Sequence, residues 1–371
     1  MRSKRTAGWH WRASAVLVVG TLVALFLPTG GDALAKRPVG PPPPQVDGGT
    51  IYYVQGGALH QMNPDGSADA TLPASIVYWA EPSTYLHGGR WFLQVQHAAG
   101  LNYPGTDPNT GAPLPRLELF AVHESGSPVV QLTDGQIDAT TFVEPDNLLG
   151  RYGEFDSVLR WTAGDTVVSY TGLLTTYDAA GNRTVHDGGI YTVAVDPDAL
   201  TGRTPTAISG PPLLSLALNA AGTTVLAQSY DWKPDGSAIV YPNHHDVPER
   251  LGVWIARASD GFSLPTRLMD NGTHLRWSPD GSMILFQYDG IRSILEDGTD
   301  ERLLVEDPAD RKKTSIRVER PSWSPSGTHV AYSLFKLTVS RNVVERDVIR
   351  ATADGDDGTQ LTAGGLPRWR E

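Results

Sequence analysis

One heptapeptide, Arg276-Trp277-Ser278-Pro279-Asp280-Gly281-Ser282, carries the clearest structural signal in this sequence. It returns as Asp231-Trp232-Lys233-Pro234-Asp235-Gly236-Ser237 and as Ser322-Trp323-Ser324-Pro325-Ser326-Gly327-Thr328, each followed by a β-rich run. Pro presets the backbone for a turn, Asp or Ser can bond its own main chain, and Gly tolerates a positive φ. Each copy therefore predicts a strand, a tight turn and a second strand.

The period of this motif predicts the architecture. Trp232, Trp277, Trp323 and Trp369 are separated by 45, 46 and 46 residues, and Trp161 opens a degenerate earlier copy. A second hairpin with an Asp-Gly turn follows in most repeats. Two hairpins per period make one four-stranded antiparallel sheet, which is the blade of a propeller. We predict an all-β fold, a single β-propeller with six four-stranded blades: one formed by the two ends of the repeat region, and five near 76–133, 140–208, 213–269, 275–305 and 322–362. Five or seven blades are the alternatives, because the second and third copies are degenerate.

The two ends of the repeat region supply complementary strands. The sequence stops at Pro367-Arg368-Trp369-Arg370-Glu371, which is the opening of a repeat. The region after residue 48 begins with Gly49-Thr50-Ile51-Tyr52-Tyr53-Val54, which lacks such an opening strand. We expect N- and C-terminal strands to share one blade, because this closes the ring and removes an unpaired sheet edge.

The repeated Trp-x-Pro-Asp-Gly-Ser motif resembles the PD40 repeat of TolB-like, WD40-like propellers, which also occurs in propeller domains of prolyl oligopeptidase-type peptidases. The resemblance covers residues 49–371. TolB itself carries an α/β domain before its propeller, where this sequence has a proline-rich segment, and the peptidases carry a hydrolase domain after theirs. The resemblance therefore implies a fold and does not transfer either family's role.

The N-terminus has the layout of a secretory signal. Basic residues precede an apolar run at 15–27, and a small-residue site follows at 33–35. We expect cleavage after Ala35, which gives a signal peptide at 1–35, a Pro-rich spacer at 36–48 and the β-propeller at 49–371. The mature protein is then secreted or periplasmic, in the cell envelope, without membrane insertion. A retained anchor is the alternative, although the run is shorter than the ~20 residues that a bilayer needs.

Composition narrows the classes of partner and chemistry. The net charge of −11 argues against nucleic acid as a partner. The absence of cysteine excludes disulfides and thiolate metal sites. We find no Gly-x-Ser-x-Gly, His-Glu-x-x-His or phosphate-loop motif. We therefore assign no catalytic residue, metal or cofactor, favour a protein that is not an enzyme, and expect a monomer.

Length variation gathers on one face of the predicted ring. Connections between the second and third strands of a blade, and between blades, lie on the same face. Here they form long predicted loops such as 97–116, 173–188 and 335–347 within blades and 306–320 between blades. Long loops on a rigid scaffold commonly carry binding sites. We select as candidate contact residues on this face His97, Tyr103, Tyr152, Tyr177, His244, His245, Asp246, Arg311, Lys312 and Lys313.

Each group of candidates has a simpler interpretation. The imidazoles and carboxylate at 244–246 could bind a metal together with His97 or His186, but solvated loop residues are the alternative. The basic residues at 311–313 could receive an anionic partner, but acidic neighbours offset their charge. The three tyrosines could anchor a partner or pack between loops.

The repeat residues themselves are interpreted as structural, because the same residue type at a fixed period indicates the same packing task in every blade. They are Trp161, Trp232, Pro234, Asp235, Gly236, Trp277, Pro279, Asp280, Gly281, Trp323, Pro325, Gly327 and Trp369. The leading hypothesis is an extracytoplasmic scaffold that binds a protein or peptide through its long-loop face. The alternatives are an enzyme with its active site in the propeller mouth, a lyase or hydrolase with or without a metal, and a small-molecule or glycan sensor.

Overall fold

The computed structural model describes most of the chain from residue 48 onward. The described ranges are 48–77, 80–83, 88–107, 109–146, 159–162, 164–208, 211–216, 230–243, 251–308, 314–338 and 343–370. The predicted signal peptide and nearly all of the predicted spacer lie outside them. Within the described ranges, no helix has the length and apolar character needed to cross a membrane.

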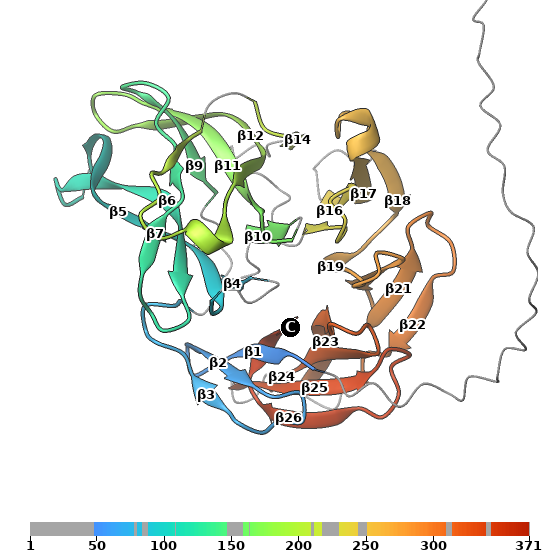
Figure 1. Ribbon diagram of the computed structural model, residues 1–371. Coiled ribbons are helices and arrows are strands. Elements are labelled where there is room, and N and C mark those ends of the chain that lie inside the picture. Colours follow the sequence, from blue (N-terminus) through green and yellow to red (C-terminus); the bar gives the residue numbers. More distant parts are fainter. Residues whose placement is uncertain are drawn as a thin grey trace, which may run out of the picture. The chain divides into compact units, whose positions relative to one another are not determined.

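Six antiparallel sheets form the blades of a β-propeller, which confirms the predicted fold class (Figure 1). In the first three blades the strands, from the innermost outward, are β27 (Gly365–Arg370), β1 (Thr50–Gln55), β2 (Ala58–Met62) and β3 (Ala70–Thr71); β4 (Glu81–Pro82), β5 (Trp91–Thr106), β6 (Pro113–His123) and β7 (Val129–Gln131); and β10 (Leu159–Thr162), β11 (Val167–Tyr177), β12 (Arg183–Ala194) and β14 (Leu214–Leu216).

The other three blades follow the same plan. Their strands, in the same order, are β15 (Asp231–Trp232), β16 (Ala238–Asn243), β17 (Gly252–Arg257) and β18 (Thr266–Met269); β19 (Thr273–Trp277), β20 (Met283–Gln287), β21 (Ile291–Leu295) and β22 (Arg302–Val305); and β23 (Thr314–Trp323), β24 (His329–Thr338), β25 (Val343–Thr352) and β26 (Thr359–Ala363). We number the blades 1 to 6, starting with the blade that contains β1.

The repeated heptapeptide forms the turn from the innermost strand to the second strand. In blade 4 the amide of Gly236 donates to the carbonyl of Lys233 at 2.8 Å, and Gly236 has a φ of 74°. The Asp235 carboxylate accepts hydrogen bonds from the Ser237 hydroxyl at 2.6 Å and from the Ser237 amide at 2.9 Å, which lower the pKa of Asp235. The turn is thus built by the residue types that its sequence predicts.

The ring is closed by strands from the two ends of the repeat region. Strands β27 and β1 pair antiparallel, with Thr50 opposite Arg370, Ile51 opposite Trp369 and Tyr52 opposite Arg368. Their blade is completed by β2 and β3. The predicted shared blade is therefore confirmed.

The core lies between blades, where each motif tryptophan packs on the preceding blade. Trp277 of β19 clusters with Val240 and Ile255 of blade 4, Trp323 of β23 with Leu285 of blade 5, and Trp369 of β27 with Ala331 of blade 6. Burial of a large aromatic ring therefore helps to hold successive blades together at these interfaces.

Two expectations about the connections were wrong. Much of the predicted loops at 97–116, 173–188 and 335–347 is paired strand, since β5–β6, β11–β12 and β24–β25 extend beyond the blades as antiparallel ladders. Register shifts lie within the first two of these ladders, and the extra residues are accommodated there as bulges. In addition, 214–216 was expected to belong to blade 4, but it pairs with β12 as the outermost strand of blade 3. Short pairs outside this plan are β9 (Thr141–Pro145) on β11 and β8 (Thr133–Asp134) on β13 (Thr206–Ala207).

Candidate functional site

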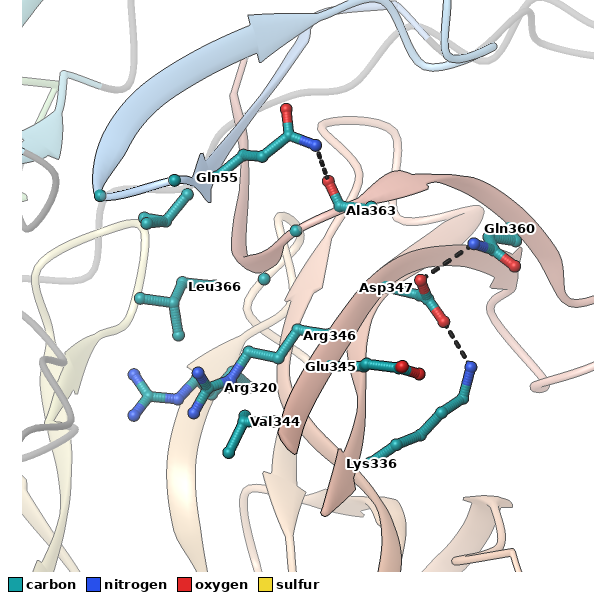
Figure 2. Close-up of a pocket in the computed structure, with 15 residues that line it drawn as sticks. Gln55, Arg320, Lys336, Val344, Glu345, Arg346, Asp347, Gln360, Ala363 and Leu366 are labelled. Carbon is teal, nitrogen blue, oxygen red and sulfur yellow. Dashed lines mark hydrogen bonds and ion pairs between the residues drawn. The ribbon is translucent and has the colours of Figure 1, made fainter. Parts of the chain in front are cut away.

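A pocket of about 650 Å³ lies between blade 6 and blade 1. Its walls come from the β1–β2 turn, the β26–β27 connection and the ends of β24 and β25, so it opens on the face where long connections were predicted (Figure 2). The volume falls within the range of roughly 300–1,000 Å³ that is usual for ligand sites. This pocket is the candidate functional site.

Charged side chains of both signs line the pocket. Lys336 Nζ lies 2.6 Å from Asp347 Oδ2, and Gln360 Nε2 donates to Asp347 Oδ1 at 3.0 Å. Arg346 Nε lies 3.3 Å from Glu319 Oε1. Figure 2 shows the Arg320 and Arg346 side chains directed the same way, with their guanidinium ends next to each other. The pocket thus offers donors to an anionic group and, on its other side, carboxylates to a cationic group.

Two residues of the pocket have an unusual backbone conformation. Arg320 and Leu366 have φ values of 58° and 60°, which costs non-glycine residues about 1–3 kcal/mol each. Both stand three positions before a motif tryptophan, as does His274, with a φ of 55°. The bulge at this position interrupts the pairing of β19, β23 and β27. The amide of Leu366 donates to Ser333 Oγ at 2.9 Å, which helps to hold the bulge in place.

The pocket also presents apolar surface and accessible main chain. Val344 of β25 is 49% exposed. A Cβ built on Gly56 or Gly57 would meet no atom within 4 Å, so the β1–β2 turn leaves its backbone open. Charged groups, an apolar side chain and free main chain together suit a ligand that is itself amphipathic.

Two of the predicted contact residues are buried in packing. The rings of Tyr103 and Tyr177 stack with centroids 4.5 Å apart, and both lie against Phe142. The Tyr177 hydroxyl donates to Glu144 Oε2 at 3.2 Å, and the Tyr103 hydroxyl accepts from the Leu117 amide at 3.3 Å. These tyrosines join the extended hairpins of blades 2 and 3, which corresponds to the packing alternative.

The other predicted contact residues do not line the pocket in the described part of the chain. His97 is exposed on β5, and His186 meets Thr176 Oγ1 at 2.8 Å. Among the residues that the structure describes, no group of three or more His, Asp or Glu is arranged to hold a metal. The remaining candidates lie outside the described ranges: Tyr152, His244, His245, Asp246, Arg311, Lys312 and Lys313.

None of the pocket residues was predicted as a contact residue, although the ranges that contain several of them were predicted to lie on the binding face. The ranges 306–320 and 335–347 were predicted to lie on the binding face, and they contribute Arg320, Lys336 and Asp347. No local motif marks these residues. The only signal is their position within a repeat.

A second polar feature occupies the innermost strands. The residue before each motif tryptophan is Arg160, Asp231, Arg276, Ser322 or Arg368, and Glu81 holds the corresponding place in β4. Glu81 Oε2 lies 3.0 Å from Arg368 Nε and 3.7 Å from Arg160 Nη1, and Glu81 Oε1 pairs with Arg370. Arg160 Nε lies 3.2 Å from Asp231 Oδ1. Burial would raise the pKa of Glu81, but the surrounding arginines outweigh it and lower the pKa to about 2.

This polar cluster links neighbouring blades. Its ion pairs connect blade 1 to blade 2, blade 2 to blade 3 and blade 3 to blade 4. The amide of Trp277 donates to Asp231 Oδ2 at 2.8 Å, and that of Trp369 to Ser322 Oγ at 2.9 Å, which adds the junctions 4–5 and 6–1. The sequence contains a signal for this polar cluster, because a polar or charged residue precedes each motif tryptophan.

The similar solved structures include propellers of different activities. A protein assigned as TolB from Agrobacterium tumefaciens is 13% identical, with a TM-score of 0.40, over 86% of this chain and 91% of that chain. An oligogalacturonate lyase in complex with manganese is 14% identical, with a TM-score of 0.34, over 76% and 73%. The periplasmic gluconolactonase of Pseudomonas aeruginosa is 11% identical, with a TM-score of 0.39, over 87% and 98%.

These similarities say nothing about the chemistry of this chain, because both identity and TM-score are low. A TolB-type protein is among the similar structures, as the repeat motif led us to expect. The six-bladed ring itself rests on the strand pairings. No protein-family model matches the chain, and no curated protein matches it.

Proposed function

We propose that this protein is a binding scaffold that holds an extended peptide segment of a protein partner in the pocket between blades 6 and 1. The supporting observation is the combination of both charge signs, exposed apolar surface and open main chain in one pocket of about 650 Å³. A peptide carries the complementary set: charged side chains, apolar side chains and its own N–H and C=O groups.

The rigid walls of the pocket favour binding. Strands β24 and β25 pair continuously from His329–Thr352 to Thr338–Val343, and Gly364 donates its amide to the Arg346 carbonyl at 2.7 Å. A preformed site loses little conformational entropy on binding, so more of the contact energy appears as affinity. The N-terminal signal layout supports a place for this binding outside the cytoplasm, in the periplasm or the medium.

A peptide-display selection against the purified protein tests the proposal. We expect enriched peptides whose affinity falls at least tenfold in Val344→Glu, because the new carboxylate adds charge beside Glu345 and removes apolar surface from the pocket. Fluorescence anisotropy with the synthetic peptides measures this change.

Val129→Glu is the matched control. Val129 is 46% exposed, close to the exposure of Val344, but it lies on β7 of blade 2 and does not line the pocket. Its affinity for the peptides should equal that of the unmodified protein. The proposal fails if no peptide is enriched, or if both variants bind the peptides equally well. If no peptide is enriched but oligosaccharides raise the melting temperature of the protein, the pocket is assigned to a glycan instead.

A further inference from the structure

The outer edge of β25 is only partly paired. Strand β24 pairs with the whole of β25, residues 343–352, whereas β26 pairs with residues 347–350 alone. Within the described ranges, no strand lies opposite Val344 or Glu345 on the β26 side. The pocket end of β25 is therefore an exposed sheet edge.

This edge is exposed because β26 leaves the sheet at Gly364. Gly364 has a φ of 143°, and a Cβ there would lie 2.7 Å from Tyr53 Cδ2 and 2.9 Å from the Val54 carbonyl oxygen. Glycine thus lets the chain turn inward to β27 against blade 1. Ala363 at the end of β26 and Val344 of β25 both line the pocket (Figure 2). The pocket therefore lies where a longer β26 would have paired with β25.

The main-chain groups of Val344 point into this space. The Arg346 carbonyl accepts a hydrogen bond from the Gly364 amide at 2.7 Å, so it is directed to the β26 side. Alternate residues of a strand direct their N–H and C=O groups to the same neighbour. Those of Val344 consequently face the pocket, where no strand residue of the described chain lies opposite them.

We infer that the peptide binds as an added β-strand along this edge, in line with β26, an inference that rests on the proposed function. The N–H and C=O of one peptide residue would bond with the C=O and N–H of Val344. Such a strand is held by main-chain hydrogen bonds, and contacts of its alternate side chains select its sequence. The partner is then an extended segment without proline at the paired residue.

The side chains at this edge predict the sequence of the partner. Val344 is 49% exposed, and it points to the opposite face of the sheet from Glu345. The peptide residue opposite Val344 shares its face, where a β-branched or aromatic side chain packs well. A neighbouring peptide residue shares the face of Glu345, where lysine or arginine complements the carboxylate. We therefore expect the selected peptides to carry an apolar residue next to a basic one.

The corresponding extension of blade 2 is built differently. Its outer strand, β6, begins with two prolines, Pro113 and Pro115, beyond the part that pairs with β7. Proline has no N–H group and is a common protection of exposed sheet edges. Strand β25 begins instead with Val343 and Val344, a residue type that favours pairing. The edge of β25 thus remains able to accept a strand.

Val344→Pro tests the inference with the synthetic peptides enriched by display. Proline removes an N–H that takes no part in the β24–β25 ladder, so the melting temperature should be unchanged. The affinity, measured by fluorescence anisotropy, should fall at least tenfold. Val344→Ala keeps the N–H and should lose less than about threefold. Equal losses in the two variants would assign the contact to the side chain and overturn the inference.

Val129→Pro is the matched control. Val129 is 46% exposed on β7 and does not line the pocket. The neighbouring Pro128 carbonyl accepts from the His123 amide at 3.1 Å, so the Val129 N–H faces away from the sheet. The control therefore removes an outward N–H from another edge, and its affinity for the peptides should equal that of the unmodified protein.

Ester substitution in the peptide tests the same contact without a protein variant. Each amide N–H of a selected peptide is replaced in turn by an ester oxygen. The replacement at the residue opposite Val344 should weaken binding at least fivefold. Replacements on either side should change it less than about twofold, because adjacent N–H groups point away from β25. Equal affinities of all the esters would overturn the inference.

The two proposals can fail separately. Enriched peptides that bind Val344→Pro as tightly as the unmodified protein, or that tolerate every ester, would overturn the added strand and leave the peptide scaffold in place. Failure to enrich any peptide would overturn both.

Discussion

A single carboxylate, that of Glu81, is in contact with three blades. It is 1% exposed and belongs to blade 2, yet it pairs with Arg368 and Arg370 of blade 1 and with Arg160 of blade 3. A buried ion pair of this kind is not by itself a source of stability, because both charges lose hydration. Removal of Glu81 is nevertheless costly, since the buried guanidinium groups around it would lose a carboxylate partner.

The pKa of Glu81 predicts how stability depends on acid. The pKa is about 2 in the folded protein, below the ordinary value of 4.5, so the contribution of Glu81 is fully present above pH 4.5. It should be lost as the pH falls from about 4.5 towards 2, by an amount of about 3 kcal/mol in unfolding free energy. Urea unfolding at a series of pH values measures this loss.

The acid dependence expected from Glu81, between pH 4.5 and 2, differs from that expected from another buried carboxyl, Glu118. Burial raises the pKa of Glu118 to about 6, so its favourable contribution disappears as the pH rises through 6 and is constant below 4.5. Glu81→Gln should flatten the acid dependence between pH 4.5 and 2 and lower stability at pH 7 by about 3–5 kcal/mol. Glu301→Gln, at an exposed ion pair, should cost less than about 1 kcal/mol. An unchanged acid profile in Glu81→Gln would show that another group is responsible.

Among the elements, the innermost strand that carries a motif tryptophan, in five of the six blades, has two tasks. Its tryptophan packs on the preceding blade, and the residue before it reaches the next blade or the central cluster. Alternation of side chains along a strand makes this division possible, because consecutive residues point to opposite faces. One short strand therefore supplies both the apolar and the polar contacts of an interface.

The packing of the innermost strand can be tested at Trp277. This ring is 5% exposed and clusters with Val240, Val253 and Ile284. Trp277→Ala should lower the unfolding free energy by about 3–5 kcal/mol, because it removes buried apolar surface and leaves a cavity between blades 4 and 5. Leu264→Ala, at a side chain that is 69% exposed, should change it by less than about 0.5 kcal/mol. Equal, small losses would place the Trp277 ring outside the core.

At the scale of the whole molecule, closure of the ring depends on β27. This strand pairs with β1 and brings Trp369 into the core of blades 6 and 1. Because no residue of β1 has another partner on that side, loss of β27 would expose a sheet edge to other molecules.

A chain that lacks residues 366–371 tests this dependence. We expect aggregation, or a broad and much earlier thermal transition, because the closing pairs and the Trp369 contacts disappear together. Size-exclusion chromatography and thermal denaturation followed by circular dichroism measure both effects. A chain that lacks only Glu371 keeps all of β27 and should behave like the unmodified protein. Normal solubility and stability of the longer truncation would contradict the role of β27 in closure.

The sequence repeat was sufficient to predict most of the fold, but it predicted little of the candidate site. Three copies of a turn motif at a constant period were sufficient to predict blades, their four strands and the shared closing blade, since each of these follows from local turn chemistry and spacing. Paired extensions such as β5–β6 beyond His97 were not predicted, because ladder pairing depends on the partner strand and its bulges rather than on local composition.

The sequence by itself determined that five of the six blades share one type of inner strand, with a tryptophan at or near its end and a variable residue before it. Only the tertiary structure decided which of those variable residues meet: Glu81 with Arg160 and Arg368, Arg160 with Asp231, and Lys336 with Asp347 in the pocket between blades 6 and 1. The physical reason is that residues in different blades approach one another only when the ring closes. The bulges at Arg320 and Leu366 that shape this pocket recur with the period, but no residue type in the sequence marks them.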